Sequence, residues 1–321
     1  MNKKTLTILI LSGVLVIIAL ILADFLGNRP GKRGANPYEY NAADFRDVDS
    51  SLIHYRETSN IALDDREPYG LDIYQDLIYI TGKEFLQSIR PDGVQLLFKT
   101  LEGTGTCIEV NNDYIFIGFS DHIAKFDKQG ELLGRWDSPG DRTFITSLAL
   151  KGNTLYAADA GNRRVIRYDQ DGNLLGTFTG KSEGEAGHGF IIPSAKFDLA
   201  VNSYDELWIV NPGMHALENY TDDGNQRGYW QKSSMEIEGF TGCCNPAHIA
   251  VLEDGSFVTS EKGMVRIKVH EASGALRSVV APPSKFKTDG KAPEVAVNSM
   301  GHIYALDFDK NRIRIFEKIQ P

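Results

Sequence analysis

The chain has 321 residues, of which 42% are hydrophobic, and its formal net charge is −9. This length and apolar content suffice to bury a sizeable core, which excludes an intrinsically disordered protein. The first 34 residues carry an excess of basic side chains, so the rest of the chain is more acidic than the net charge of the whole chain indicates. Such a surface repels phosphate backbones, so we expect no nucleic-acid partner.

Residues 1–26 are predicted to form a membrane anchor or signal segment. An uncharged, mostly aliphatic stretch runs from Thr5 to Ala23 behind two lysines, and it is long enough to span a bilayer. No small-x-small cleavage site follows it, which favours an uncleaved anchor. We therefore expect a single transmembrane helix with the rest of the chain on the exported side, periplasmic or extracellular. Residues 27–48, rich in Gly, Pro, Asn and charge, are predicted to be a linker.

A repeated pattern organises the remainder of the chain. Each repeat has an apolar strand, a short polar turn, and a second apolar strand that carries an aromatic residue. The repeats begin at Leu71, Ile108, Leu148, Leu199, Ile249 and Val295. Their spacing falls within or close to the periods that are typical of propellers and solenoids. The recurring aromatics are expected to be core residues, namely Tyr79, Phe116, Tyr156, Trp208, Phe257 and Tyr304.

Further strands complete each repeat. A third strand ends in most repeats at a glycine turn that leads into a fourth strand, as in antiparallel hairpins. The sixth repeat stops after its third strand, and a strand-like segment from Ser51 is available to complete it. We therefore predict that residues 49–321 form an all-β, six-bladed β-propeller closed by its own N-terminal strand, which removes an exposed sheet edge. A β-solenoid is the competing architecture.

The third repeat resembles an NHL repeat. The residues that carry the resemblance are Asp159, Asn162, Arg163, Val165, Ile166 and Gly172. The sixth repeat matches through Asp307, Asn311, Arg312 and Ile313. Membership of this family implies a propeller fold, but its members include scaffolds, receptors, lactonase-like hydrolases and a lyase. The resemblance therefore leaves the activity open. We expect the Asp and Asn residues of these turns to be structural.

The residues just before each innermost strand are predicted to form a ring at one mouth of the central channel. They are Gly70, Cys107, Ser147, Asp198, His248 and Glu294. Asp198, His248 and Glu294 come from consecutive repeats and are candidates for a divalent metal site or for general acid–base catalysis. The simpler interpretation makes His248 a hydrogen-bonding rim residue and pairs the two carboxylates with neighbouring lysines.

Two long connections are predicted to form a lid over this mouth. They carry His188, Cys243 and Cys244, and His215 lies in a nearby turn. Together with Cys107 and Ser147, these residues are candidate ligand-binding groups. Four alternatives stay open for the cysteines: a disulfide between Cys243 and Cys244, a bridge from one of them to Cys107, soft metal ligation with His248, or free thiols.

The sequence contains no P-loop, nucleophile elbow or zinc-protease motif, and the glycine-rich stretch at 103–107 lacks the strand-to-helix context of a phosphate site. Our leading hypothesis is a membrane-tethered propeller that binds a small ligand, a peptide or a partner protein at the channel mouth. The alternatives are a metal-dependent enzyme of the lactonase or lyase kind, with a divalent metal ion as its cofactor, and a redox accessory protein that uses the adjacent cysteines.

Overall fold

The computed structural model describes residues 2–27, 41–64, 66–181 and 188–320. The chain divides into two compact units, Met1–Ala42 and Ala43–Pro321. The first contains helix α1 (Lys3–Gly27), which has no buried part and includes an 18-residue window with a mean hydropathy of 3.1. The helix is long and apolar enough to cross a membrane, a property that a signal sequence shares. Most of the predicted linker lies outside the described residues.

The second unit consists of β-sheets, with short 3-10 turns η1 (Ala42–Phe45), η2 (Ser50–Leu52), η3 (Pro212–Met214) and η4 (Pro283–Lys285). The first sheet contains β2 (Pro68–Tyr74), β3 (Leu77–Ile89), β4 (Gln95–Val110), β5 (Tyr114–Phe119), β6 (Ile123–Asp127) and β7 (Leu132–Arg135). Two four-stranded sheets follow, one with β8 (Ile145–Lys151), β9 (Thr154–Asp159), β10 (Arg164–Asp169) and β11 (Leu174–Phe178), and one with β12 (Leu199–Val201), β13 (Leu207–Asn211), β14 (Ala216–Tyr220) and β15 (Gln226–Gln231).

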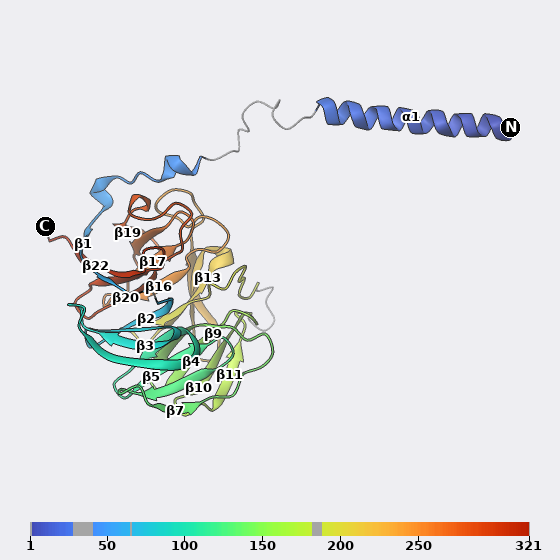
Figure 1. The fold of residues 1–321 in the computed structure, drawn as a ribbon. Helices are drawn as coiled ribbons and strands as arrows, with labels where there is room; N and C mark the ends of the chain where they lie inside the picture. The colour runs from blue at the N-terminus through green and yellow to red at the C-terminus, as the bar shows by residue number, and fades with distance from the viewer. Residues whose placement is uncertain (1, 28–40, 65, 182–187, 321) are drawn as a thin grey trace. The chain divides into compact units, whose positions relative to one another are not determined.

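The last two sheets contain four strands each. One has β16 (His248–Val251), β17 (Phe257–Glu261), β18 (Arg266–His270) and β19 (Leu276–Ala281), and the other has β20 (Glu294–Val297), β21 (Ile303–Asp307), β22 (Arg312–Lys318) and β1 (Tyr55–Ala62). All neighbouring strands in the sheets are antiparallel. The sheets follow one another around a common centre, as blades of a propeller (Figure 1).

The prediction of six blades is wrong, because the described strands form five sheets. The difference arises at β4, a single strand of 16 residues. Its first part pairs with β3 and its last part pairs with β5, so two expected repeats share one six-stranded sheet. The glycine-rich stretch at 103–107 lies inside β4 and does not end it. Gly103 adopts a φ of +116°, and the register shifts between Gly105 and Cys107, so a bulge absorbs the irregularity.

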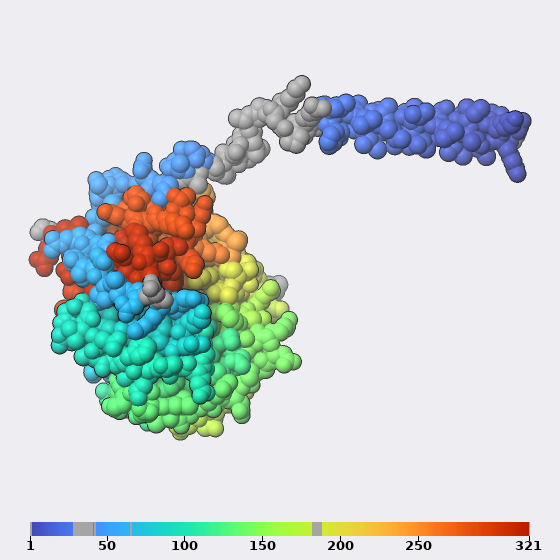
Figure 2. Space-filling model, viewed as in Figure 1, coloured from blue at the N-terminus to red at the C-terminus, as the bar shows by residue number. Residues whose placement is uncertain are grey.

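The predicted closure by the N-terminal strand is confirmed. β1 pairs with β22 in antiparallel register from Tyr55 opposite Lys318 to Ala62 opposite Arg312. In Figure 2 the light-blue N-terminal segment accordingly lies against the red C-terminal segment. The expected start at Ser51 was too early, since that residue belongs to η2. A strand from one end of the chain thus completes the sheet that contains the other end, which protects an edge of that sheet.

The core lies between neighbouring sheets and within their innermost strands. All six recurring aromatics are buried, as the sequence predicts. The Trp208 and Phe257 rings, from successive sheets, meet edge to face with centroids 4.8 Å apart.

The Asp turn of the third predicted repeat is structural, as expected. Asp159 is fully buried and accepts hydrogen bonds from the backbone N–H of Phe144 and from the side chain of Asn162. Its ion pair is formed with Arg164, at 2.9 Å. Arg163, the arginine that was matched to the NHL pattern, instead occupies a left-handed backbone position with a φ of +54°. The arginine that pairs with the aspartate of this turn is therefore Arg164, one residue later than the NHL resemblance indicated.

Candidate functional site

The innermost strands converge on a narrow central channel of about 220 Å³. Its walls come from β2, β4, β8, β12, β16 and β20, and they include Cys107, Ser147, Asp198 and Glu294. A larger cavity of about 1000 Å³ shares Glu294 with this channel and also contains His248 and Cys243 in its wall. The structure thus brings together the residues predicted to begin the innermost strands.

Much of the wall of the larger cavity consists of residues that lie one position before the predicted ring residues. Tyr69, Thr106, Thr146 and Phe197 line it, and each directly precedes a residue of the predicted ring. Neighbouring side chains in a strand point to opposite faces. In each pair the first residue therefore faces the larger cavity, and the ring residue after it faces the narrow channel. The threonine hydroxyls also fasten the sheets together. Thr146 donates to the carbonyl of Phe197 at 2.6 Å, and Thr106 donates to the carbonyl of Ile145 at 2.7 Å.

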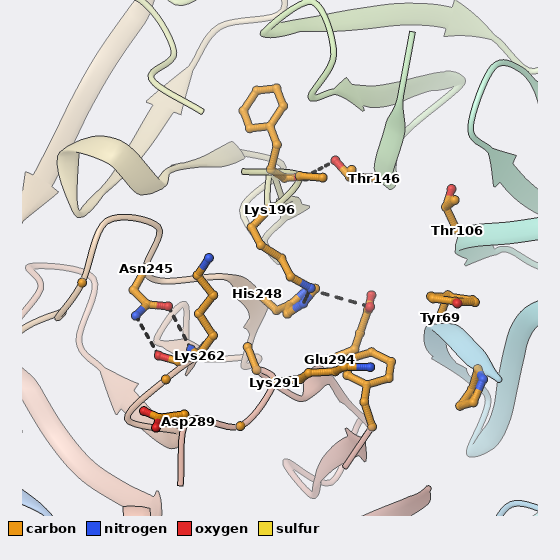
Figure 3. Close-up of a pocket in the computed structure, with 18 of the residues that line it drawn as sticks. Tyr69, Thr106, Thr146, Lys196, Asn245, His248, Lys262, Asp289, Lys291 and Glu294 are labelled. Carbon is orange, nitrogen blue, oxygen red and sulfur yellow. Dashed lines mark hydrogen bonds and ion pairs between the residues drawn. The ribbon is translucent and has the colours of Figure 1, made fainter. Parts of the chain in front are cut away.

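Four polar side chains form the centre of the site, and Figure 3 shows three of them, Lys196, His248 and Glu294. His248 Nδ1 lies 3.7 Å from Asp198 Oδ2 and 3.8 Å from Glu294 Oε2. Its other nitrogen, Nε2, lies 3.1 Å from Lys196 Nζ. Because a lysine ammonium is only a donor, Nε2 must accept, and the ring hydrogen resides on Nδ1, facing the two carboxyl groups.

Burial sets the protonation of this cluster. Burial lowers the pKa of His248 well below its ordinary value, and the charge on Lys196 lowers it further. Burial raises the pKa of Glu294 well above its ordinary value, and the nearby Asp198 adds to the shift. Burial also raises the pKa of Asp198, to about 6. Burial thus favours the neutral form of both the His248 imidazole and the Glu294 carboxyl group, the kind of shift that general acid–base chemistry uses.

The two carboxyl groups have different roles. Asp198 accepts backbone N–H groups from Leu199 at 2.9 Å and from Ile249 at 2.8 Å, so it fastens β12 to β16. Asp72 makes the equivalent bond to Val110, at 2.8 Å. Glu294 Oε2 lies 3.8 Å from His248 Nδ1, which is beyond hydrogen-bond distance, and the described residues supply it no side-chain hydrogen bond. Asp198 is thus held as a structural tie, whereas Glu294 faces the cavity.

The geometry gives no support to the predicted metal site at His248, Asp198 and Glu294. No group of three or more His, Cys, Asp or Glu side chains that could hold a metal ion occurs in the described part of the chain. The ammonium of Lys196 and the two backbone donors already occupy the atoms that a cation would need. The divalent cofactor remains a sequence-based prediction, which metal analysis of the purified protein can test.

Three lysines from different connections project toward the same cavity, namely Lys196, Lys262 and Lys291 (Figure 3). Burial lowers the pKa of Lys196, the charges of Glu294 and Asp198 partly offset this, and the ammonium groups of Lys262 and Lys291 lower it further. Within the described residues, none of the three forms an ion pair at 4.0 Å or less. Three lysines thus line one cavity of an acidic chain, and its wall also includes the carboxyl groups of Glu67, Asp289 and Glu294.

The other predicted ligand residues separate into two groups. Cys243 is exposed and lines the cavity, with Cys244 buried beside it. The remaining four do not line it: Cys107 and Ser147 lie in the narrow channel, His188 contacts the carbonyl of its own neighbour Gly189, and His215 bridges Ser233 and the carbonyl of Gly242. Part of the connection that carries His188 lies outside the described residues.

The predicted disulfide between Cys243 and Cys244 is not present. All three cysteines are free, and the two adjacent Sγ atoms lie 3.1 Å apart, well beyond the length of a sulfur–sulfur bond. Cys107 is buried beside Phe116 and Ile145 and is not bridged to either. All three cysteines are free in the structure, and their ligation of a soft metal ion stays a prediction.

Sequence reasoning missed most of the cavity wall. The three lysines, Tyr69, Phe144 and Phe308 all line the cavity. They lie in connections or at strand ends, where no periodicity identifies a facing direction. A usable signal did exist at four of the six ring positions, where the preceding residue lines the cavity, namely Tyr69, Thr106, Thr146 and Phe197.

Several solved structures are similar to this chain. A streptogramin B lyase aligns with a TM-score of 0.60 at 13% identity, covering 82% of this chain and 98% of its own. A catalytically inactive His-to-Ala variant of virginiamycin B lyase from Staphylococcus aureus, with quinupristin, aligns with a TM-score of 0.59 at 14% identity, covering 83% of this chain and 100% of its own. A structural genomics protein of unknown function from Bacteroides thetaiotaomicron aligns with a TM-score of 0.58 at 14% identity, covering 80% of this chain and 72% of its own.

At these identities the likeness shows the fold alone: the chain is an all-β propeller with an N-terminal apolar helix. No family model matches the sequence, and a search of curated proteins found no match. The NHL resemblance is therefore supported as far as the propeller fold and no further.

Glu294 provides a test of the protonation state of the site. Its pKa in the folded chain is raised by burial, so its contribution to stability is fully present below its unfolded pKa and is lost as pH rises through the raised value. We expect Glu294→Gln to lose less stability than the wild type between about pH 5 and about pH 9. Thermal unfolding at both pH values measures this. Glu67→Gln, at an exposed carboxylate, should follow the wild type, and parallel pH profiles for all three proteins would contradict the assignment.

Proposed function

We propose that this protein is a membrane-tethered propeller that binds a small anionic ligand in the 1000 Å³ cavity. The observation that carries the proposal is the convergence of Lys196, Lys262 and Lys291 on that cavity without carboxylate partners among the described residues. Unpaired cations in a cavity are stabilised by a ligand of opposite charge. Phe144, Phe197 and Phe308 supply apolar walls, as small-molecule sites usually have.

The cavity favours a small ligand over a peptide or a protein partner. A volume of about 1000 Å³ lies at the upper end of the range for small-molecule sites. Helix α1 is proposed to anchor the chain in a membrane, with the propeller on the exported side, because its length and hydropathy suit a bilayer.

A second candidate function is acid–base catalysis on the bound ligand. It is favoured by the proximity of His248 and Glu294 in the cavity wall, where Nδ1 and Oε2 lie 3.8 Å apart and burial lowers the pKa of the imidazole and raises that of the carboxyl group. The similar folds of streptogramin B and virginiamycin B lyases are compatible with this function, but they do not carry it.

Binding of a matched pair of probes tests the leading proposal. Naphthalene-2-carboxylate carries a charge, and naphthalene-2-carboxamide has the same shape without it. With the full-length chain in lipid nanodiscs, calorimetry should show the carboxylate binding at least about tenfold more tightly. Lys291→Met should reduce that preference, whereas Lys287→Met, at an exposed lysine outside the cavity, should not. Equal affinities of the wild type for both probes would refute the proposal.

A further inference from the structure

One of two adjacent cysteines, Cys243, lines the cavity, and Cys244 is buried beside it. Neighbouring side chains of an extended chain point in opposite directions, yet Cys243 Sγ and Cys244 Sγ lie 3.1 Å apart. The chain turns here, and Gly242 takes up a left-handed φ of +75°. Cys243 is exposed to the cavity, while Cys244 is 1% exposed.

The turn is held in place by its neighbours. The side chain of Asn245 donates to the carbonyl of Thr241 at 2.6 Å and accepts the N–H of Lys262 at 2.9 Å. The N–H of Thr241 donates in turn to the buried Glu261 at 3.2 Å. These bonds fix the backbone on both sides of the two cysteines, so the sulfur pair is preorganised rather than a chance approach of flexible side chains.

Polar groups surround the inner sulfur. Lys262 Nζ lies 3.3 Å from Ser194 Oγ, and both side chains hydrogen-bond to the Cys244 sulfur. Burial alone raises the pKa of the Cys244 thiol, but the bonds from Ser194 and Cys243 and the charge of Lys262 outweigh it, so the pKa is lowered. The hydrogen bond to Cys244 raises the pKa of Cys243. Cys244 is therefore the more readily ionised thiol of the pair, and Cys243 is the thiol that more readily keeps its proton.

Two other roles fit the site less well. A purely structural cysteine is normally buried and inert, whereas Cys243 is exposed. A soft metal ion needs further ligands, and the described residues supply no third His, Cys, Asp or Glu that completes such a group. The Lys262 ammonium beside the sulfurs also repels a cation.

We propose that Cys243 and Cys244 form a thiol–disulfide exchange site that reduces small organic disulfides entering the cavity. The exposed position of Cys243 identifies the attacking sulfur, and the buried neighbour identifies the resolving sulfur. This inference does not depend on anion binding in the same cavity.

The exchange balances in two steps. The Cys243 proton passes to the Cys244 thiolate, Cys243 forms a bond to one sulfur of the disulfide, and the other sulfur leaves as a thiolate. Cys244 then gives its proton to that thiolate and attacks the Cys243 sulfur, which releases the second half of the substrate as a thiolate. The two cysteines are oxidised, and the substrate disulfide is reduced to two thiol equivalents.

The product would be a strained, reversible disulfide. Consecutive Cα atoms are about 3.8 Å apart, below the usual range of about 4.4–6.8 Å for bridged cysteines. Strained disulfides are readily reduced. An external thiol therefore restores the dithiol, and the site serves exchange rather than permanent cross-linking.

The test uses the reduced full-length chain with the neutral probe 2-hydroxyethyl disulfide, followed by intact mass and peptide mapping. The wild type should lose two hydrogens, and Cys244→Ser should retain a mixed disulfide on Cys243. Cys243→Ser should react at least about tenfold more slowly. Cys107→Ser is the matched control and should behave as the wild type.

Lys262→Met should move the pH–rate profile to higher pH, a readout that a merely structural lysine would leave unchanged. Wild-type rates in Cys243→Ser, or an adduct confined to Cys107, would overturn the inference. Because 2-hydroxyethyl disulfide carries no charge, a failure of the exchange reaction can be distinguished from a failure of anion binding. Only naphthalene-2-carboxylate reports anion binding.

Discussion

Removal of the closing strand is expected to abolish cooperative folding of the propeller. A chain truncated before residue 63 lacks β1, and the edge of β22 from Arg312 to Lys318 loses its backbone partner. Exposed strand edges pair with other chains. Arg314 also loses its ion pair with Glu57, at 2.7 Å. We expect the truncated chain to aggregate and to show no single thermal transition.

A second truncation provides the control. A chain that starts at residue 43 retains the whole second compact unit, including β1. It should be monomeric and should unfold in one transition by circular dichroism. If both truncated chains proved equally stable and monomeric, the pairing of β1 with β22 would not be what closes the fold.

Loss of the buried carboxylate at Glu261 should destabilise the protein by about 3–5 kcal/mol. Glu261, Arg266 and Lys268 are all fully buried, and the carboxylate lies 2.7 Å from Arg266 Nε and 2.8 Å from Lys268 Nζ. Burial opposes the ionisation of Glu261, but Lys268 and Arg266 together hold its pKa below the ordinary value. Glu261→Ala leaves two cations buried without their counter-ion.

The same cluster positions the connection that leads to the cysteines. Arg266 donates to the carbonyl of Gly239 at 2.8 Å, and Glu261 accepts the N–H of Thr241. Urea unfolding measures the loss for Glu261→Ala, with Glu253→Ala, at an exposed site, as the control. A change below about 1 kcal/mol would show that the cluster is not a stabilising ion network.

The sequence predicts those parts of the fold that depend on alternation and composition. The buried aromatics, the closing strand and the convergence of His248, Asp198 and Glu294 all follow from strand periodicity, because residues at equivalent repeat positions reach the same end of the sheets. The blade count did not follow. A glycine-rich stretch resembles a loop in sequence, and only the pairing of β4 with both β3 and β5 shows that the strand continues through it.

The candidate site was harder to predict for two physical reasons. Lys196, Lys262 and Lys291 lie before or between strands, where the direction of a side chain depends on backbone turns that have no sequence period. The state of Cys243 and Cys244 depends on a local bend and on the surrounding charges, neither of which their adjacency specifies.

The central claim is that lysine charge in the cavity recruits an anion. Its most direct test is the calorimetric affinity for naphthalene-2-carboxylate of the wild type and of a Lys262→Met/Lys291→Met double variant, both full-length and in nanodiscs. Two lost charge-assisted bonds predict a decrease of about 100-fold or more in the double variant, with carboxamide binding unchanged. If the double variant bound the carboxylate as tightly as the wild type, these lysines would not form the binding site.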